Sequence, residues 1–230
     1  MKSHSFEKKL RILCAIYRWS DDIALALQKW ACRSECPTCC TASVAITTLE
    51  AAYLWEENSA LLRERMKRWP QRHSLPPFAM TTNEHASLCI DRKECEEFAG
   101  PVTDAPCPLL EDKRCLCYEA RPLMCRMLFS LYPCAETGQA EISSRLLSLN
   151  TVSIQMVEHL DQRGWSGYLV DLLPYFNKDA FLDEYYAGVC RMQDPRIRRN
   201  QPSPGLLVPP EHHEEIGQWL KELTSLLKTL

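Results

Sequence analysis

The sequence has little glycine, no long apolar run and no excess of charge of one sign. Only 7 glycines stand against 15 prolines in 230 residues, while alanine, leucine and glutamate are plentiful. This composition predicts a mostly α protein whose loops are punctuated by proline. No stretch approaches the ~20 consecutive apolar residues that cross a bilayer, so we expect no membrane span.

Charge balance and the amino terminus indicate which kinds of partner and which cellular location to expect. The 27 basic and 30 acidic residues give a net charge of −3, so no overall attraction draws the chain to nucleic acid, which is not expected as a partner. Charged residues interrupt the apolar positions of the amino terminus, which leaves no secretory signal and predicts a cytoplasmic protein. No Gly-rich phosphate loop, H-E-x-x-H or G-x-S-x-G pattern is present, so the enzyme classes that these motifs mark are not indicated.

Cysteine is the residue in excess. The chain has 13 cysteines, more than a protein of the reducing cytosol keeps without a use, and clustered cysteines there are more often metal ligands than disulfide partners. Eight of them form two blocks: Cys32, Cys36, Cys39 and Cys40, then Cys107, Cys115, Cys125 and Cys134. Cys117 is a ninth candidate. The cysteines that stand alone in helical patterns are interpreted as small buried hydrophobic residues: Cys14, Cys89, Cys95 and Cys190.

The spacing within the blocks is that of chelating thiolates. Two or three intervening residues let successive thiolates converge on one centre. Because one zinc ion takes four ligands, eight cysteines indicate either a polynuclear cluster or two sites. Cys39 and Cys40 are adjacent, and neighbouring side chains diverge, so they serve different metals or one of them lies outside the coordination shell. Arg121 and Arg126 flank the second block and are cofactor-binding candidates, because a guanidinium group there offsets thiolate charge.

The order of the motifs resembles that of a known family. The motifs are C-x3-C-x2-C-C at Cys32–Cys40, T-x-x-E at Thr47–Glu50, C-P-L-L at Cys107–Leu110 and C-x-C-Y-E-x-R-P-x-x-C-R at Cys115–Arg126. This order is similar to that of the YkgJ-type cysteine-cluster proteins, which are described as zinc- or iron-chelating. The resemblance implies a metal centre, usually assigned as iron–sulfur, bound by up to eight cysteines. A relative of this family, the flagellin lysine N-methylase, looks like an iron–sulfur protein that uses S-adenosylmethionine.

These observations give three hypotheses for function. The first is a protein that binds an iron–sulfur cluster, preferably a four-iron one, with a redox or cluster-based catalytic role. The second is an S-adenosylmethionine-dependent methyl transfer enzyme resembling the lysine N-methylase, in which Cys32, Cys36 and Cys39 leave one iron open. The third is a zinc-stabilised module that binds a protein partner or substrate through its C-terminal amphipathic helix.

The expected architecture has two parts. Residues 1–143 form an irregular cysteine-rich metal-binding core with N-terminal helices, and residues 144–230 form a helical C-terminal region packed on it. Apolar periodicity predicts one long or two stacked helices over Ile12–Trp30, a helix from the capping box Thr47–Glu50 to Pro70, a third from Thr82 or Asn83 to near Gly100, a fourth from Ser144, and a last helix over Ile216–Leu230.

Overall fold

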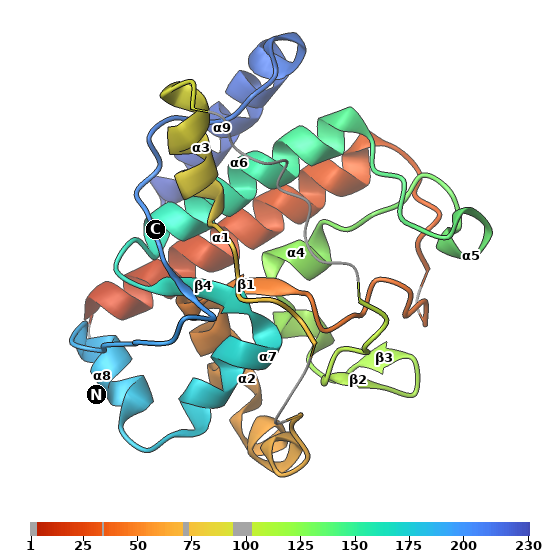
Figure 1. Ribbon diagram of the computed structural model, residues 1–230. Coiled ribbons are helices and arrows are strands. Elements are labelled where there is room, and N and C mark those ends of the chain that lie inside the picture. The colour runs from red at the N-terminus through yellow and green to blue at the C-terminus, as the bar shows by residue number, and fades with distance from the viewer. Residues whose placement is uncertain (1–3, 34, 71–73, 94–102) are drawn as a thin grey trace.

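The computed structural model describes residues 4–33, 35–70, 74–93 and 103–230, which are mostly helical and confirm the predicted class (Figure 1). The longer helices are α1 (His4–Leu27), α2 (Thr48–Met66), α3 (Thr82–Ile90), α6 (Ser144–Leu160), α8 (Phe181–Ala187) and α9 (His213–Leu227). Single helical turns are α4 (Leu123–Arg126), α5 (Cys134–Thr137) and α7 (Leu169–Leu172). The strands are β1 (Ala45–Thr47), β2 (Leu110–Glu111), β3 (Arg114–Cys115), β4 (Trp165–Tyr168) and β5 (Arg198–Arg199).

Helices α1 and α6 form the centre of the fold, where Figure 1 shows them side by side. The hydroxyls of Ser20 in α1 and Ser153 in α6 form a buried polar pair between these helices, 3.0 Å apart. Helix α9 packs on α1, and the Trp19 indole N–H donates to the backbone carbonyl of Trp219 at 3.0 Å. The first predicted stretch is therefore one continuous helix, and it ends at Leu27 rather than at Trp30.

Helix α2 begins at the capping box that the sequence predicts. The Thr47 hydroxyl accepts from the Glu50 backbone N–H at 3.2 Å, and the Glu50 carboxylate accepts from the Thr47 N–H at 2.9 Å. The helix ends at Met66, one turn before Pro70. Its backbone is kinked at Asn58, whose φ of −137° is not helical.

A small antiparallel sheet, in the order β1–β4–β5, is absent from the sequence-based prediction. Its strands are only two to four residues long, and two glycines interrupt the sequence pattern around β4: Gly164 directly before the strand and Gly167 within it. Both glycines are required by close packing: a Cβ on Gly164 would lie 2.1 Å from the Thr48 hydroxyl, and one on Gly167 would lie 2.7 Å from Ile197. The sheet brings β4 against β1, directly before the N-terminus of α2.

Two further predictions concern the third and the last helices. Helix α3 opens at Thr82 as predicted but ends at Ile90, and residues 94–102, which include Cys95, lie outside the described part of the chain. In α9 the residues Ile216 and Leu223 are buried against the rest of the protein, and Trp219, Leu220 and Leu227 are partly buried against the core. Leu226 and Leu230 stay 41% and 40% exposed. Within the described residues, none of the helices has the length and apolar character that a bilayer crossing requires.

Candidate metal centre

All eight block cysteines line one cavity. Its volume is about 440 Å³. The thiol-bearing lining residues are Cys32, Cys36, Cys39, Cys40, Cys107, Cys115, Cys125 and Cys134, and the two candidate arginines, Arg121 and Arg126, line it as well. Every cysteine in the described ranges is a free thiol. The fold thus collects from two distant segments the side chains that the sequence singled out.

The thiols share this cavity without forming a finished coordination shell. Among the residues that the structure describes, no three histidine, cysteine, aspartate or glutamate side chains lie close enough together to hold a metal ion. The cysteines are carried mainly by loops and single helical turns, segments whose backbone can adjust more easily than that of a long helix.

The first block is a loop between α1 and β1 that is fixed at both ends. At its start the Ala31 N–H donates to the carbonyl of Ser130 at 2.9 Å, and the Ser130 N–H points to the Cys32 thiol at 3.3 Å. At its end the Cys107 N–H donates to the carbonyl of Cys40 at 2.8 Å. The loop therefore touches the segment of Cys134 at one end and the segment of Cys107 at the other.

The second block begins in a loop held by Arg65 of α2. The Arg65 guanidinium donates to the carbonyl of Pro108 at 2.7 Å and to that of Leu110 at 3.1 Å, and it pairs with Glu111 at 3.2 Å. The β2–β3 hairpin follows, with positive φ angles of 46° at Asp112 and 64° at Lys113. Two consecutive positive φ angles are typical of the tight two-residue turns whose twist matches a hairpin. The hairpin returns the chain so that Cys115 faces the cavity.

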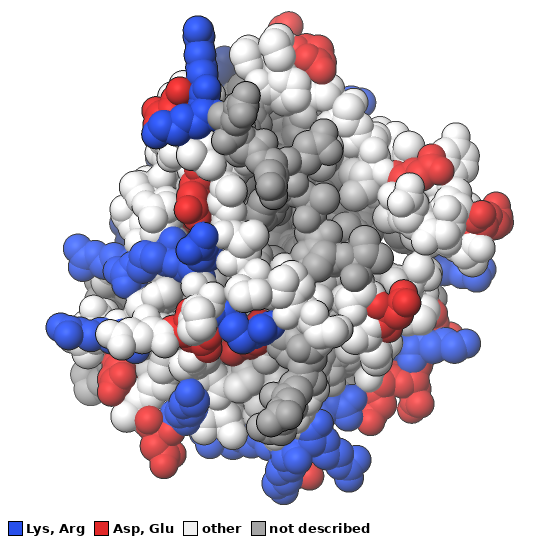
Figure 2. Space-filling view, in the orientation of Figure 1, with Lys and Arg blue, Asp and Glu red and all other residues white. Residues whose placement is uncertain are grey.

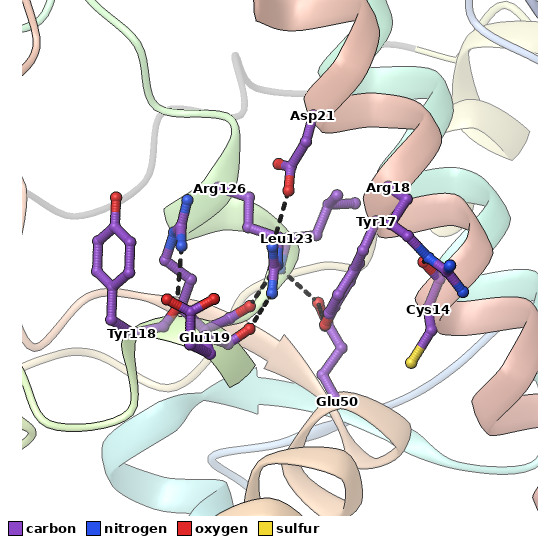
Figure 3. A network of polar contacts seen from close by, with 10 residues as sticks. Cys14, Tyr17, Arg18, Asp21, Glu50, Tyr118, Glu119, Leu123 and Arg126 are labelled. Carbon is purple, nitrogen blue, oxygen red and sulfur yellow. Dashed lines mark hydrogen bonds and ion pairs between the residues drawn. The ribbon is translucent and has the colours of Figure 1, made fainter.

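The turn α4 carries Cys125 and is held from below by a buried carboxylate, Glu50 (Figure 3). The Glu50 side chain accepts from the backbone N–H of Leu123 at 2.8 Å and from the Tyr17 hydroxyl at 2.9 Å. Burial and the nearby Glu50 charge raise the pKa of Tyr17 well above its usual range, so the phenol keeps the proton that it donates. One residue of the predicted capping box thereby ties α1, α2 and α4 together.

Arg126 makes several polar contacts, which Figure 3 shows as dashed lines. Its guanidinium pairs with Asp21 at 2.8 Å, donates to the carbonyls of Arg121 and Glu119, and lies over the Tyr17 ring at 4.5 Å from the centroid. Its side chain is only 10% exposed. This geometry gives Arg126 a structural role in fixing the α4 turn at the wall of the cavity.

Arg121 is held by fewer partners than Arg126, and its charge acts on a cavity thiol. It stacks on the Tyr118 ring at 3.9 Å from the centroid and donates to the Tyr118 carbonyl at 2.9 Å. Burial raises the pKa of Cys115, and the positive charge of Arg121 offsets part of this effect. Of the two candidate arginines, Arg121 is the one whose charge acts on a cavity cysteine in this way.

The buried thiols of the cavity hold their protons strongly. Burial raises the pKa of Cys107 to about 11 and that of Cys125 well above its usual range. The adjacent pair behaves differently: a hydrogen bond between Cys39 and Cys40 raises the pKa of Cys39 and lowers that of Cys40. Thiolates are the form that binds metal, so in this cavity an incoming cation has to displace the protons.

The cysteines outside the cavity differ among themselves. Cys117 is 2% exposed, does not line the cavity, and has its pKa raised by burial to about 12. Cys190 is buried as predicted and Cys14 is half-buried, but the prediction for Cys89 is wrong, because its thiol is exposed at the end of α3 beside His85. Cys89 lies one residue before the end of α3 at Ile90.

Three residues of the site were not identified from the sequence. Glu50 was recognised as part of a helix cap, but its contact with Leu123 depends on a turn far away in the chain. In the sequence Arg65 is one of several basic residues before Trp69, and Tyr17 is one of several apolar and aromatic residues near the amino terminus, so neither stands out. No local pattern distinguishes such residues, because their partners are set by tertiary packing.

Charge on the molecular surface is mixed. On the face that Figure 2 shows, basic and acidic side chains are interspersed. Near the cysteine blocks the ion pair of Arg114 with Glu35 joins the hairpin to the first cysteine loop. Both side chains are largely exposed, at 73% and 51%, so this pair adds little stability.

Comparison of the chain with protein-family models, with curated proteins and with solved structures gives no match. The resemblance to the YkgJ-type proteins therefore stays a prediction from the motifs.

Proposed function

We propose that this protein binds an iron–sulfur cluster in the eight-cysteine cavity and uses it in a redox or cluster-based catalytic role. The observation that carries the proposal is the collection of eight free thiols, from two segments far apart in the sequence, around one cavity. Sites with only thiolate ligands suit iron–sulfur clusters and other soft-metal centres. The motif order shared with the YkgJ-type proteins supports the same conclusion.

The residues around the cavity fit such a group in donor type and in charge. A bound cluster would supply electron transfer or an electrophilic iron. The cysteines would bind it as thiolates, and the Arg121 guanidinium beside Cys115 would offset part of their negative charge. Behind them, Glu50 and Arg126 would hold the α4 turn, and with it Cys125, in place.

Metal and acid-labile sulfide content, measured on protein purified without oxygen, tests this proposal. The expected result is iron and sulfide in equal amounts, about four of each per four-iron cluster, with a broad absorption band in the blue. Cys36→Ser and Cys125→Ser should each lower the iron content, whereas the matched control Cys190→Ser, outside the cavity, should keep it. Full iron content in the first two variants would contradict the assignment.

Zinc is the second candidate, because all eight candidate ligands in the cavity are cysteine thiols. Structural zinc sites are closed and four-coordinate, and four cysteines are one of their common ligand sets. The same measurement separates the two metals, because a zinc protein is colourless and contains no sulfide. Zinc in place of iron would leave the cavity as a metal centre but assign it a structural role.

A further inference from the structure

A second pocket, of about 110 Å³, lies between β1, α4, α6 and the start of α3. Figure 1 shows α4 beside β1, and both α4 and α3 pack on α6. The pocket walls are mostly apolar and include the buried side chains of Ile46, Phe78, Leu123 and Val157. None of the eight block cysteines lines it, so this pocket is distinct from the thiol cavity.

The side chain of Met124 separates the pocket from the thiol cavity. Among the residues that the structure describes, it is the only one that lines both. Its sulfur accepts a hydrogen bond from the Ala45 N–H at 3.2 Å. A thioether is a weak acceptor, and methionine is an unbranched side chain with three rotatable bonds. Met124 can therefore turn aside at the cost of one weak hydrogen bond, and the next residue, Cys125, is a cavity thiol.

The pocket and the cavity carry opposite charge. Two buried carboxylates, Glu50 and Glu158, line the pocket, and no described lysine or arginine does. The cavity lining has three arginines, Arg33, Arg121 and Arg126, and within the described ranges it has no aspartate or glutamate. In a mostly apolar pocket the two carboxylates repel an anion strongly, because little solvent screens them. An anionic ligand is therefore excluded from the pocket.

A cation is not favoured either, since both carboxylates already serve other donors. One Glu50 oxygen accepts from the Leu123 N–H at 2.8 Å and the other from the Thr47 N–H at 2.9 Å. The two Glu158 oxygens likewise each accept from a backbone N–H, at 2.8 and 2.9 Å. An ammonium group in the pocket would lose its hydration and find no carboxylate oxygen without a donor. The chemistry of the walls thus suits an uncharged molecule.

The size of the pocket limits this molecule to a few heavy atoms. An apolar cavity of ~150 Å³ can hold benzene, and the pocket, at about 110 Å³, is slightly smaller. Turning Met124 aside would open it toward the thiol cavity and add the missing space.

We propose that this pocket binds a small, uncharged, mostly apolar molecule and holds it beside the metal centre, with the Met124 side chain between them. Binding is a property of the pocket alone. The role of the bound molecule as a substrate of the cluster rests on the proposed metal-binding function.

Fluorine NMR of fluorobenzene with the full-length protein, purified without oxygen, tests the binding. We expect saturable binding at one site, displaced by benzene. Fluorobenzoate carries the same ring with a negative charge and should not bind under the same conditions. Absence of saturable fluorobenzene binding, or equal binding of fluorobenzoate, would overturn the proposal, and neither result depends on a variant that folds.

Two variants that fill the pocket locate the site. Ala45 and Thr82 line the pocket from different elements and are only partly buried. Ala45→Phe and Thr82→Leu should each weaken fluorobenzene binding, whereas Ala187→Phe, on an exposed residue of α8, should keep it. Circular dichroism of each variant checks that the helical content is retained. Unchanged binding in both folded pocket variants would place the probe elsewhere and overturn the assignment.

The same probe tests the position beside the cluster. In protein that contains the cluster, reduction by dithionite makes the cluster paramagnetic, and the resonance of bound fluorobenzene should broaden. Binding without broadening in such protein would overturn the placement beside the metal centre. Protein that binds the probe but contains neither iron nor zinc would contradict the metal-binding proposal and leave the pocket as a binding site.

Discussion

Replacing Glu50 by glutamine tests whether the buried carboxylate behind the cavity holds the fold together. Each Glu50 carboxylate oxygen accepts from a backbone N–H: one from Leu123 at 2.8 Å, the other from Thr47 at 2.9 Å. Glutamine has one acceptor oxygen and one NH₂ group. In either orientation of its amide, one of the two backbone donors therefore faces another donor.

The magnitude follows from this unmade hydrogen bond. A buried donor without a partner costs ~1–3 kcal/mol, and Glu50 is 5% exposed, so water does not replace the lost acceptor. We expect the free energy of unfolding to fall by about 2 kcal/mol in Glu50→Gln. Glu50→Ala should cost more, since it leaves both donors unpaired and removes the acceptor of the Tyr17 hydroxyl.

Urea unfolding followed by circular dichroism measures the change through the transition midpoint. The matched control is Glu57→Gln, which makes the same chemical change on an exposed residue of the same helix and should stay within about 0.5 kcal/mol of the wild type. Equal midpoints for Glu50→Gln and Glu57→Gln would refute the reasoning, because they would show that Glu50 satisfies no buried donor.

Three further predictions concern the same core and the cysteine loop. Gly164→Ala places a Cβ 2.1 Å from the Thr48 hydroxyl and 2.2 Å from the Asp161 carboxylate, and this overpacking should lower the free energy of unfolding by ~1–3 kcal/mol; a melting temperature equal to that of the wild type would contradict it. Burial raises the pKa of Asp161 from 3.8 to about 6, so the folded state binds this proton more tightly than the unfolded state does. The contribution of this proton to the free energy of unfolding is complete below about pH 4, and ~3 kcal/mol of it is lost as the pH rises through about 6. Stability curves between pH 4 and 7 should show that loss in the wild type and not in Asp161→Asn. Arg65→Ala removes the hydrogen bonds that hold the loop at residues 108–110 and should speed amide exchange there with little change in α6, whereas unchanged exchange in that loop would show that Arg65 does not anchor it.

The sequence predicts those residues of the site that are recognised by their spacing along the chain. The block cysteines, Arg121 and Arg126 all line the cavity, because chelating spacings and the flanking arginines are local features. Residues such as Arg65 could not be found in this way, since Arg65 binds a loop that is distant in the sequence. Sequence spacing also left open whether the cysteines serve one centre or two, and that question depends on which thiols become neighbours.

The fold also divides into features that local sequence patterns predict and features that only tertiary packing decides. Local patterns determined the mostly α class, the start of α2 at its capping box and the apolar stripes of α6 and α9, since caps and helical periodicity act within a few residues. Only tertiary structure decided the β1–β4–β5 sheet, whose strands of two to four residues gain their hydrogen bonds from distant partners. It likewise decided that Cys117 is buried while Cys115, two positions earlier, lines the cavity. Burial of a side chain depends on what packs around it, and that is set by elements that the local sequence does not contain.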